Sequence, residues 1–226
     1  DIDVRLIAKK IAGFINVPIE EGNTLLFLDE IQECPEAIMA LRFFKEDYPE
    51  LHVVAAGSLL EFTLQELPTF GVGRIHSLFM YPMTFDEFLR ANKEFGLIEM
   101  RDEADSHHPL DAAFHEKLVE YFRIYLLVGG MPEAVLAWIK THDFNQCRSV
   151  LEDIVLTYED DFSKYKKRVN PDLLRITMRG VCHQVGEKLT FRQVSADHQS
   201  SQIREALRLL ALAGIITPVV ATSGNG

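Results

Sequence analysis

The stretch NTLLFLDEIQECP, residues 23–35, contains a short apolar run that is followed directly by two adjacent acids, Asp29 and Glu30. An apolar run of this length without polar alternation is typical of a strand in a parallel sheet that is covered on both faces. Pro35 stands where it can begin a helix, and residues 36–47 carry apolar side chains at helical spacing. We therefore predict a buried strand, a sharp turn that carries the two acids, and a helix.

A second apolar run, LHVVAAG at residues 51–57, follows that helix. The order strand, helix, strand predicts a pair of parallel strands that are joined by a right-handed crossover. We expect a helix over 58–67 and a third strand over 73–82 to follow. Thr84 and Glu87 then have the spacing of a capping box, which predicts the start of another helix.

The two acids follow the first predicted strand at the end where an open α/β sheet binds its ligands. An aspartate there holds Mg²⁺ through the water shell of the ion, because Mg²⁺ prefers a carboxylate together with phosphates and waters. The next glutamate can polarise an attacking water. Asp29 is therefore a candidate for nucleotide and Mg²⁺ binding, and Glu30 is a candidate catalytic residue. The alternative is an acid that only caps the next helix.

Two further polar residues are candidates for the same site. Ser58 follows the second predicted strand, so we expect it beside Asp29 at the sheet edge, where it can contact a terminal phosphate. A helix N-cap is the alternative for this serine. Arg74 lies in the sequence GVGR, after the loop that leads into the third predicted strand, and an arginine there can serve a phosphate within the same chain or in a neighbouring one. A surface salt bridge is the alternative for Arg74.

The composition is that of a soluble globular protein. Hydrophobic residues make up 47% of the 226 residues and charged residues 25%. No apolar run approaches the roughly 20 residues that span a membrane. The three cysteines are far apart and fit no zinc site or disulfide framework. We therefore expect a cytoplasmic location and no membrane partner.

The formal net charge of −11 is distributed unevenly along the chain. Residues 1–162 hold 13 Lys and Arg against 30 Asp and Glu, whereas residues 163–192 hold eight against two. An acidic protein is a poor nucleic-acid binder overall, but a local basic segment can still contact phosphates. The alternative is a basic helix face that is only solvated.

The second half of the sequence has helical periodicity, interrupted by GGMP at 129–132. The stretch from 188 to 220 reads as a short helix, a turn, a longer helix over 199–213 and a strand, which is the order of a winged helix. Such a domain docks either DNA or a protein. The candidate nucleic-acid contacts are Lys166, Lys167, Arg168, Arg204 and Arg208.

Six segments, taken in order, resemble one known family: TLLFLDEIQ, AAGSLLEF, GVGRIHSLFMYPMTFDEF, YLLVGGMPEAV, LTYEDDFSKY and IREALRLLALAGIITPV. This is the bacterial and archaeal family of AAA-type ATPases with a C-terminal domain of unknown function, and the resemblance covers nearly the whole chain. It implies that Asp29 and Glu30 form the Walker B pair and that Ser58 is the sensor 1 residue. Arg74 matches the arginine of the family's GR signature. The resemblance also implies ATP and Mg²⁺ as cofactors and assembly into a homo-oligomer.

The chain departs from the family pattern because it contains no G-x-x-x-x-G-K-[ST] motif, the P-loop that cradles phosphates. In the family this motif lies just upstream of residue 1, and family members continue past residue 226 into a domain that resembles a restriction-type nuclease fold. We therefore expect a fragment that is inactive by itself and has no ATP or Mg²⁺ bound to it.

The predicted fold class is α/β followed by mostly α. We expect an incomplete, parallel-sheet AAA-type core at 1–100, without its P-loop strand, and a linker at 101–111. A helical region at 112–180 and a winged-helix domain at 181–226 complete the predicted organisation. The predicted function is part of a cytoplasmic switch that binds and hydrolyses ATP. The alternative is a non-catalytic binding module that uses its winged helix to dock DNA or a protein.

Overall fold

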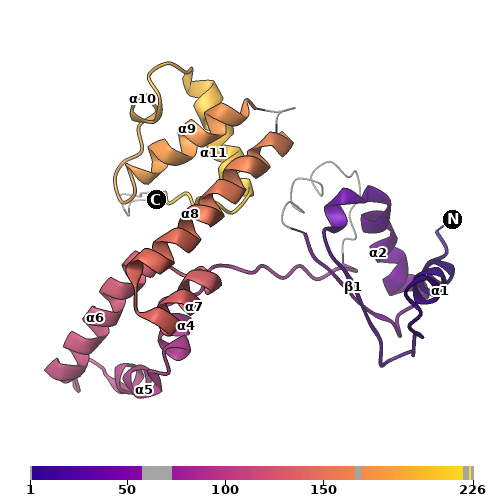
Figure 1. Ribbon diagram of the computed structural model, residues 1–226, viewed down its shortest axis with the longest axis horizontal. Helices are drawn as coiled ribbons and strands as arrows, with labels where there is room; N and C mark the ends of the chain where they lie inside the picture. Colours follow the sequence, from indigo (N-terminus) through magenta and orange to yellow (C-terminus); the bar gives the residue numbers. More distant parts are fainter. Residues whose placement is uncertain (1, 58–72, 166–168, 221–223, 225–226) are drawn as a thin grey trace. The chain divides into compact units, whose positions relative to one another are not determined.

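The computed structural model shows a mostly helical chain with one small parallel sheet (Figure 1). Placement is described for residues 2–57, 73–165, 169–220 and 224. The chain divides into two compact units, Phe79–Pro171 as one and Asp1–Leu78 with Asp172–Gly226 as the other. The order of the elements, a small parallel sheet with its helices followed by helices alone, agrees with the predicted fold class of α/β followed by mostly α.

The N-terminal part contains the predicted strand–helix–strand unit. Its elements are α1 (Val4–Ile15), β1 (Leu25–Leu28), the 3-10 helix η1 (Ile31–Glu33), α2 (Pro35–Asp47) and β2 (His52–Ala55). The strands are parallel, and their register pairs Leu25 with His52 and Leu28 with Ala55. The parallel pair, the helix between its strands and the helix start at Pro35 are therefore confirmed.

One face of this sheet packs against α1 and α2. Leu26 and Val53 point into a core that contains Ala8 of α1, Phe44 of α2 and Leu51. The opposite face is open in the described part of the chain, where Leu25 is 57% exposed and Phe27 55% exposed. The prediction that the strands are covered on both faces is wrong for the described residues, because both helices lie on one face.

The predicted third strand is absent from the described residues of its range. Residues 75–82 have irregular backbone, and Met80 is 98% exposed. A strand gains its backbone hydrogen bonds from a neighbouring strand, and no strand in the described residues pairs with this segment. The predicted helix over 58–67 lies outside the described residues.

The middle unit is a set of packed helices: α4 (Phe85–Ala91), α5 (Phe95–Glu103), α6 (Ala112–Val128), α7 (Pro132–Thr141), α8 (Phe144–Asp161) and the 3-10 helix η2 (Phe162–Tyr165). The predicted capping box is confirmed, since Thr84 N donates to Glu87 Oε2 at 2.7 Å and Glu87 N donates to Thr84 Oγ1 at 3.3 Å. The helix α5 continues through Glu103, so the predicted linker at 101–111 begins inside a helix.

The GGMP break brings two segments of this unit into direct backbone contact. Met83 N donates to Gly130 O at 2.7 Å, and Tyr125 Oη donates to Met83 O at 2.8 Å. A Cβ atom on Gly130 would lie 2.2 Å from Met83 O, far inside van der Waals contact. Only glycine allows this approach, so the break fixes the start of α4 against the end of α6.

A carboxylate joins α6 to the turn between α4 and α5. Lys117 Nζ donates to Glu94 Oε2 at 2.8 Å, and Tyr121 Oη donates to Glu94 Oε1 at 2.6 Å. The bond from Lys117 is the largest cause that lowers the pKa of Glu94, and the bond from Tyr121 adds to it. Burial, followed by this hydrogen bond, raises the pKa of Tyr121 to about 12.

The C-terminal part contains α9 (Pro171–Cys182), α10 (Phe191–Val194) and α11 (Ser200–Leu212). The short helix, the turn and the longer helix are confirmed. Gly180 of α9 lies against Val194, whose Cα would be 2.8 Å from a Cβ at that glycine. The predicted strand over 215–220 is not formed, and Val219 and Val220 are almost fully exposed. The described residues therefore show the helices of the predicted winged helix but not its strand.

Gly130→Ala should destabilise the middle unit by about 3 kcal/mol or more, because the new methyl group must displace the Met83 backbone. Urea denaturation measures this change. Gly96→Ala is the matched control, since a Cβ at Gly96 meets nothing within 4 Å, and it should be neutral or slightly stabilising. Equal stability of the two variants would contradict the contact.

Glu94→Gln should lower the free energy of unfolding by about 1 kcal/mol at pH 7, because the charged acceptor of two hydrogen bonds is lost. The folded-state pKa of Glu94 is lowered, so its contribution is present above the unfolded pKa of about 4.3 and is lost as pH falls through the lowered value. The difference between wild type and variant should therefore shrink from pH 7 to pH 3. Denaturation curves at the two pH values measure it, and a constant difference would contradict the assignment.

Candidate functional site

The two acids of the opening sequence lie where the parallel strands end. Ala56 N donates to Leu28 O at 2.8 Å, and Ile31 N donates to Ala56 O at 3.0 Å. These two bonds continue the ladder past both strands and fold the Asp29–Glu30 turn over the end of β2. Ile31 is buried at 3% exposure and anchors the turn, whereas both acids are exposed. The turn therefore presents two carboxylates at the carboxyl edge of the sheet.

The backbone of the turn is unusual at its second acid. Glu30 has φ 48° and ψ 41°, the left-handed helical conformation. This conformation costs a residue with a Cβ about 1 kcal/mol, and strained residues of this kind cluster at functional sites. Asp29 stabilises the turn, since its Oδ1 accepts a hydrogen bond from Glu30 N at 3.0 Å.

A neighbour that the sequence analysis did not single out contacts the Glu30 side chain. Gln32, in η1, donates a hydrogen bond from its Nε2 to Glu30 Oε2. The amide oxygen Oε1 of Gln32 is buried and has no hydrogen-bond partner among the described residues. In the sequence, Gln32 is visible only as a glutamine two positions after Glu30. The hydrophobic periodicity places it in a turn and indicates no contact with Glu30.

The structure does not bring Arg74 to these acids. The Arg74 guanidinium forms an ion pair with the Glu46 carboxylate near the end of α2. The helix α2 runs away from the carboxyl edge of the sheet. At a rise of 1.5 Å per residue, Glu46 lies about 16 Å from Pro35 along the helix. Arg74 is thus held toward the opposite end of the sheet from Asp29. Ser58 lies outside the described residues.

The donor set at the turn fits Mg²⁺ that is bound mainly through water and phosphate. In the part of the chain that the structure describes, no three His, Cys, Asp or Glu side chains gather into a metal-binding group. Mg²⁺ is usually held by one or two carboxylates, with waters and substrate phosphates as its other ligands. An exposed Asp29 meets this requirement, while the sequence supplies no glycine-rich P-loop for the phosphates.

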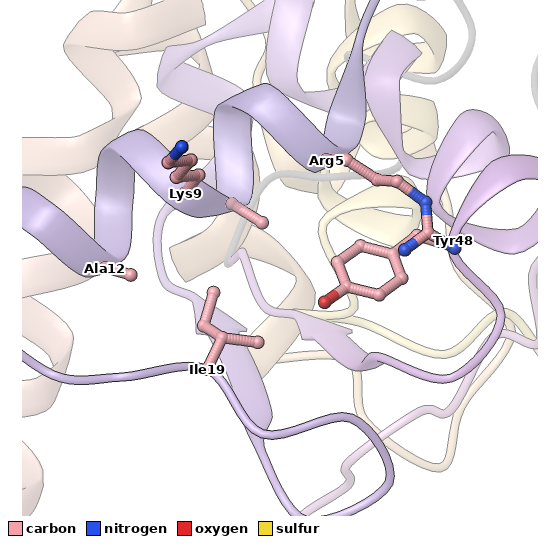
Figure 2. A pocket seen from close by; sticks show the side chains of 6 residues that line it. Arg5, Lys9, Ala12, Ile19 and Tyr48 are labelled. Carbon is pink, nitrogen blue, oxygen red and sulfur yellow. The ribbon is translucent and has the colours of Figure 1, made fainter.

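A small pocket lies along α1, beside the segment that follows this helix and the residue that follows α2. It is lined by Arg5, Ala8, Lys9, Ala12, Ile19 and Tyr48. Figure 2 shows Arg5 beside the Tyr48 ring, where its guanidinium carbon is 4.2 Å from the ring centroid. Burial is the largest cause that raises the pKa of Tyr48, and the charge of Glu21 adds to it. Since Tyr48 follows the end of α2, this pocket is separate from the turn at Asp29.

The candidate nucleic-acid contacts on α11 are already engaged within the chain. Arg208 donates from Nε and Nη2 to the two carboxylate oxygens of Glu205, at 2.9 and 2.8 Å. This bidentate pair raises the pKa of Arg208 and offsets its charge. The Arg204 guanidinium lies 5.8 Å from the centroid of the Phe191 ring. Lys166, Lys167 and Arg168 lie outside the described residues.

Within the described ranges, no helix is both long and apolar enough to cross a membrane.

The parallel strand–helix–strand unit, with two exposed carboxylates at its carboxyl edge, is typical of open α/β folds. Comparison with family models is more specific. Residues 1–89 match the model described as AAA domain, and residues 119–226 match the domain of unknown function DUF8612. No curated protein and no solved structure gave a significant match. The N-terminal part is therefore similar to AAA-type ATPase domains, and an uncharacterised domain follows it.

The strain at Glu30 is directly testable. Glu30→Gly should give a protein that is about 1 kcal/mol more stable than Glu30→Ala, because glycine adopts the left-handed conformation without steric cost and alanine does not. Both variants lack the carboxylate. The difference between their free energies of unfolding, measured by urea denaturation, therefore reports the cost of the backbone conformation at position 30. A less stable glycine variant would show that the turn does not hold this conformation in solution.

Proposed function

We propose that this chain is part of an ATP-driven, AAA-type switch protein in which Asp29 and Glu30 serve the bound nucleotide. One observation carries this proposal: two exposed carboxylates follow β1 at the carboxyl edge of a parallel sheet. The same residues lie inside the segment that matches the AAA domain model.

The two acids have different roles in this proposal. Asp29 holds Mg²⁺ through the water shell of the ion, for which a single exposed carboxylate is sufficient. Glu30 orients the attacking water and accepts its proton as a general base. When bound, Mg²⁺ neutralises charge on the phosphate oxygens. Ser58, which follows β2 in the sequence, contacts the terminal phosphate in this proposal.

Arg74 has a part in this proposal only as a residue supplied to a second copy. Its ion pair with Glu46 keeps it away from Asp29 of its own chain. An arginine that acts between subunits stabilises the charge of phosphoryl transfer in other nucleotide hydrolases. The proposal therefore includes a homo-oligomer, and a cytoplasmic location in keeping with three free cysteines.

In this proposal, the helical and C-terminal parts respond to the state of the bound nucleotide. A nucleotide-dependent change at the turn alters how these parts are oriented, as in other hydrolases that order or release segments with the γ-phosphate. The C-terminal helices α10 and α11 then present a winged-helix-like surface to a partner.

Glu30→Gln in the full-length protein should retain ATP binding and lower the hydrolysis rate by about a hundredfold or more, because the general base is lost. Asp29→Asn should weaken ATP binding only when Mg²⁺ is present. Calorimetric titration and phosphate release measure these two effects. Glu33→Gln, an exposed neighbour in η1, is the control and should behave as wild type.

Two results would contradict the proposal. One is a full-length wild type that neither binds nor hydrolyses ATP. The other is a Glu30→Gln variant that hydrolyses ATP at the wild-type rate, which would assign the base to another residue.

A further inference from the structure

Gln32 occupies a rigid position beside the proposed general base. It is the middle residue of η1, whose ends are fixed by backbone bonds from Glu33 N to Glu30 O and from Cys34 N to Ile31 O, each 3.0 Å long. Ile31 before it is buried, and its backbone N donates a hydrogen bond to the carbonyl oxygen of Ala56, the residue after β2. The Gln32 side chain therefore starts from a backbone that the sheet holds in place.

The two ends of the Gln32 amide have opposite environments. The nitrogen Nε2 donates to Glu30 Oε2, whereas the buried oxygen Oε1 finds no partner in the described part of the chain. A buried acceptor without a partner is destabilising. An apolar side chain of similar length would fill the same space without that cost. Stability alone therefore does not explain an amide at this position.

The contact of Gln32 with Glu30 distinguishes the two carboxylate oxygens of the proposed base. Oε2 accepts the bond from Gln32, while Oε1 has no hydrogen-bond partner among the described residues. The terminal torsion of a glutamate is broad, so an exposed carboxylate without such a bond rotates through many orientations. Small misplacements of a catalytic group strongly reduce the rate.

We propose that Gln32 is a positioning residue, whose amide fixes the Glu30 carboxylate so that Oε1 faces the attacking water. This inference rests on the proposed function, since it assigns the orientation of the base in that reaction. Gln32 itself does not touch the substrate. It acts through Glu30, whose backbone is already constrained by its left-handed conformation.

Gln32→Met tests this role in the full-length protein, because methionine has a similar length but no hydrogen-bonding group. We expect kcat to fall about tenfold or more and KM for ATP to stay within about twofold of wild type. The melting temperature without nucleotide should be unchanged or higher, since the unpartnered oxygen is removed. A residue with a purely structural role would lose stability and activity together.

Gln32→Glu adds a pH-dependent readout. The new carboxylate lies beside Glu30, and two carboxylates this close raise the pKa of one of them. At high pH both are charged and repel each other, so kcat relative to wild type should be lowest near pH 8. Toward pH 6 the pair takes up a proton and can restore a hydrogen bond, so the relative kcat should rise. Glu33→Gln is again the control and should show no such profile.

The outcomes separate this inference from the proposed function. A wild type without ATP turnover would refute the proposed function and the positioning role with it. Turnover in wild type, together with wild-type kcat in Gln32→Met, would refute only the inference. A parallel loss of kcat and melting temperature in Gln32→Met, or a flat pH profile in Gln32→Glu, would also refute it.

Discussion

The parallel pairing of β1 with β2 is the constraint on which the candidate site depends. Its register places Leu28 beside Ala55, and the next backbone bonds, through Ala56, hold the following turn over the strand end. Parallel strands require a crossover, and α2 supplies it while packing with α1 on one face of the sheet. Without this ladder Asp29 and Glu30 would be two exposed acids in a loop, with no fixed relation to a second strand.

The turn combines features that lower stability and that a purely structural turn would not need. Glu30 is in the left-handed conformation, and the buried oxygen of Gln32 lacks a partner among the described residues. Each feature has an alternative that costs less, glycine at 30 and an apolar residue at 32. Their occurrence within three positions is typical of a functional site rather than of a connection between elements.

Local signals in the sequence predicted most of the elements. The helix start at Pro35, the capping box at Thr84 and the break at Gly130 depend on residues a few positions apart, so the sequence contains their cause. The exposed sheet face around Phe27 and the irregular segments at 75–82 and 215–220 depend on neighbours that a single strand pattern does not specify. The ion pair of Arg74 with Glu46 joins residues 28 positions apart, and no local pattern predicts it. The sequence does not predict a role for Gln32, because that role depends on one side-chain contact, the hydrogen bond to Glu30.

Hydrogen–deuterium exchange of the full-length protein, with and without ATP and Mg²⁺, tests whether the Asp29–Glu30 turn binds the nucleotide. We expect slower exchange at the backbone amides of residues 29–33 when both are present, and no change with ATP alone, because Mg²⁺ links Asp29 to the nucleotide. Unchanged exchange at 29–33, with ATP bound elsewhere in the protein, would contradict the assignment of this turn as the nucleotide site.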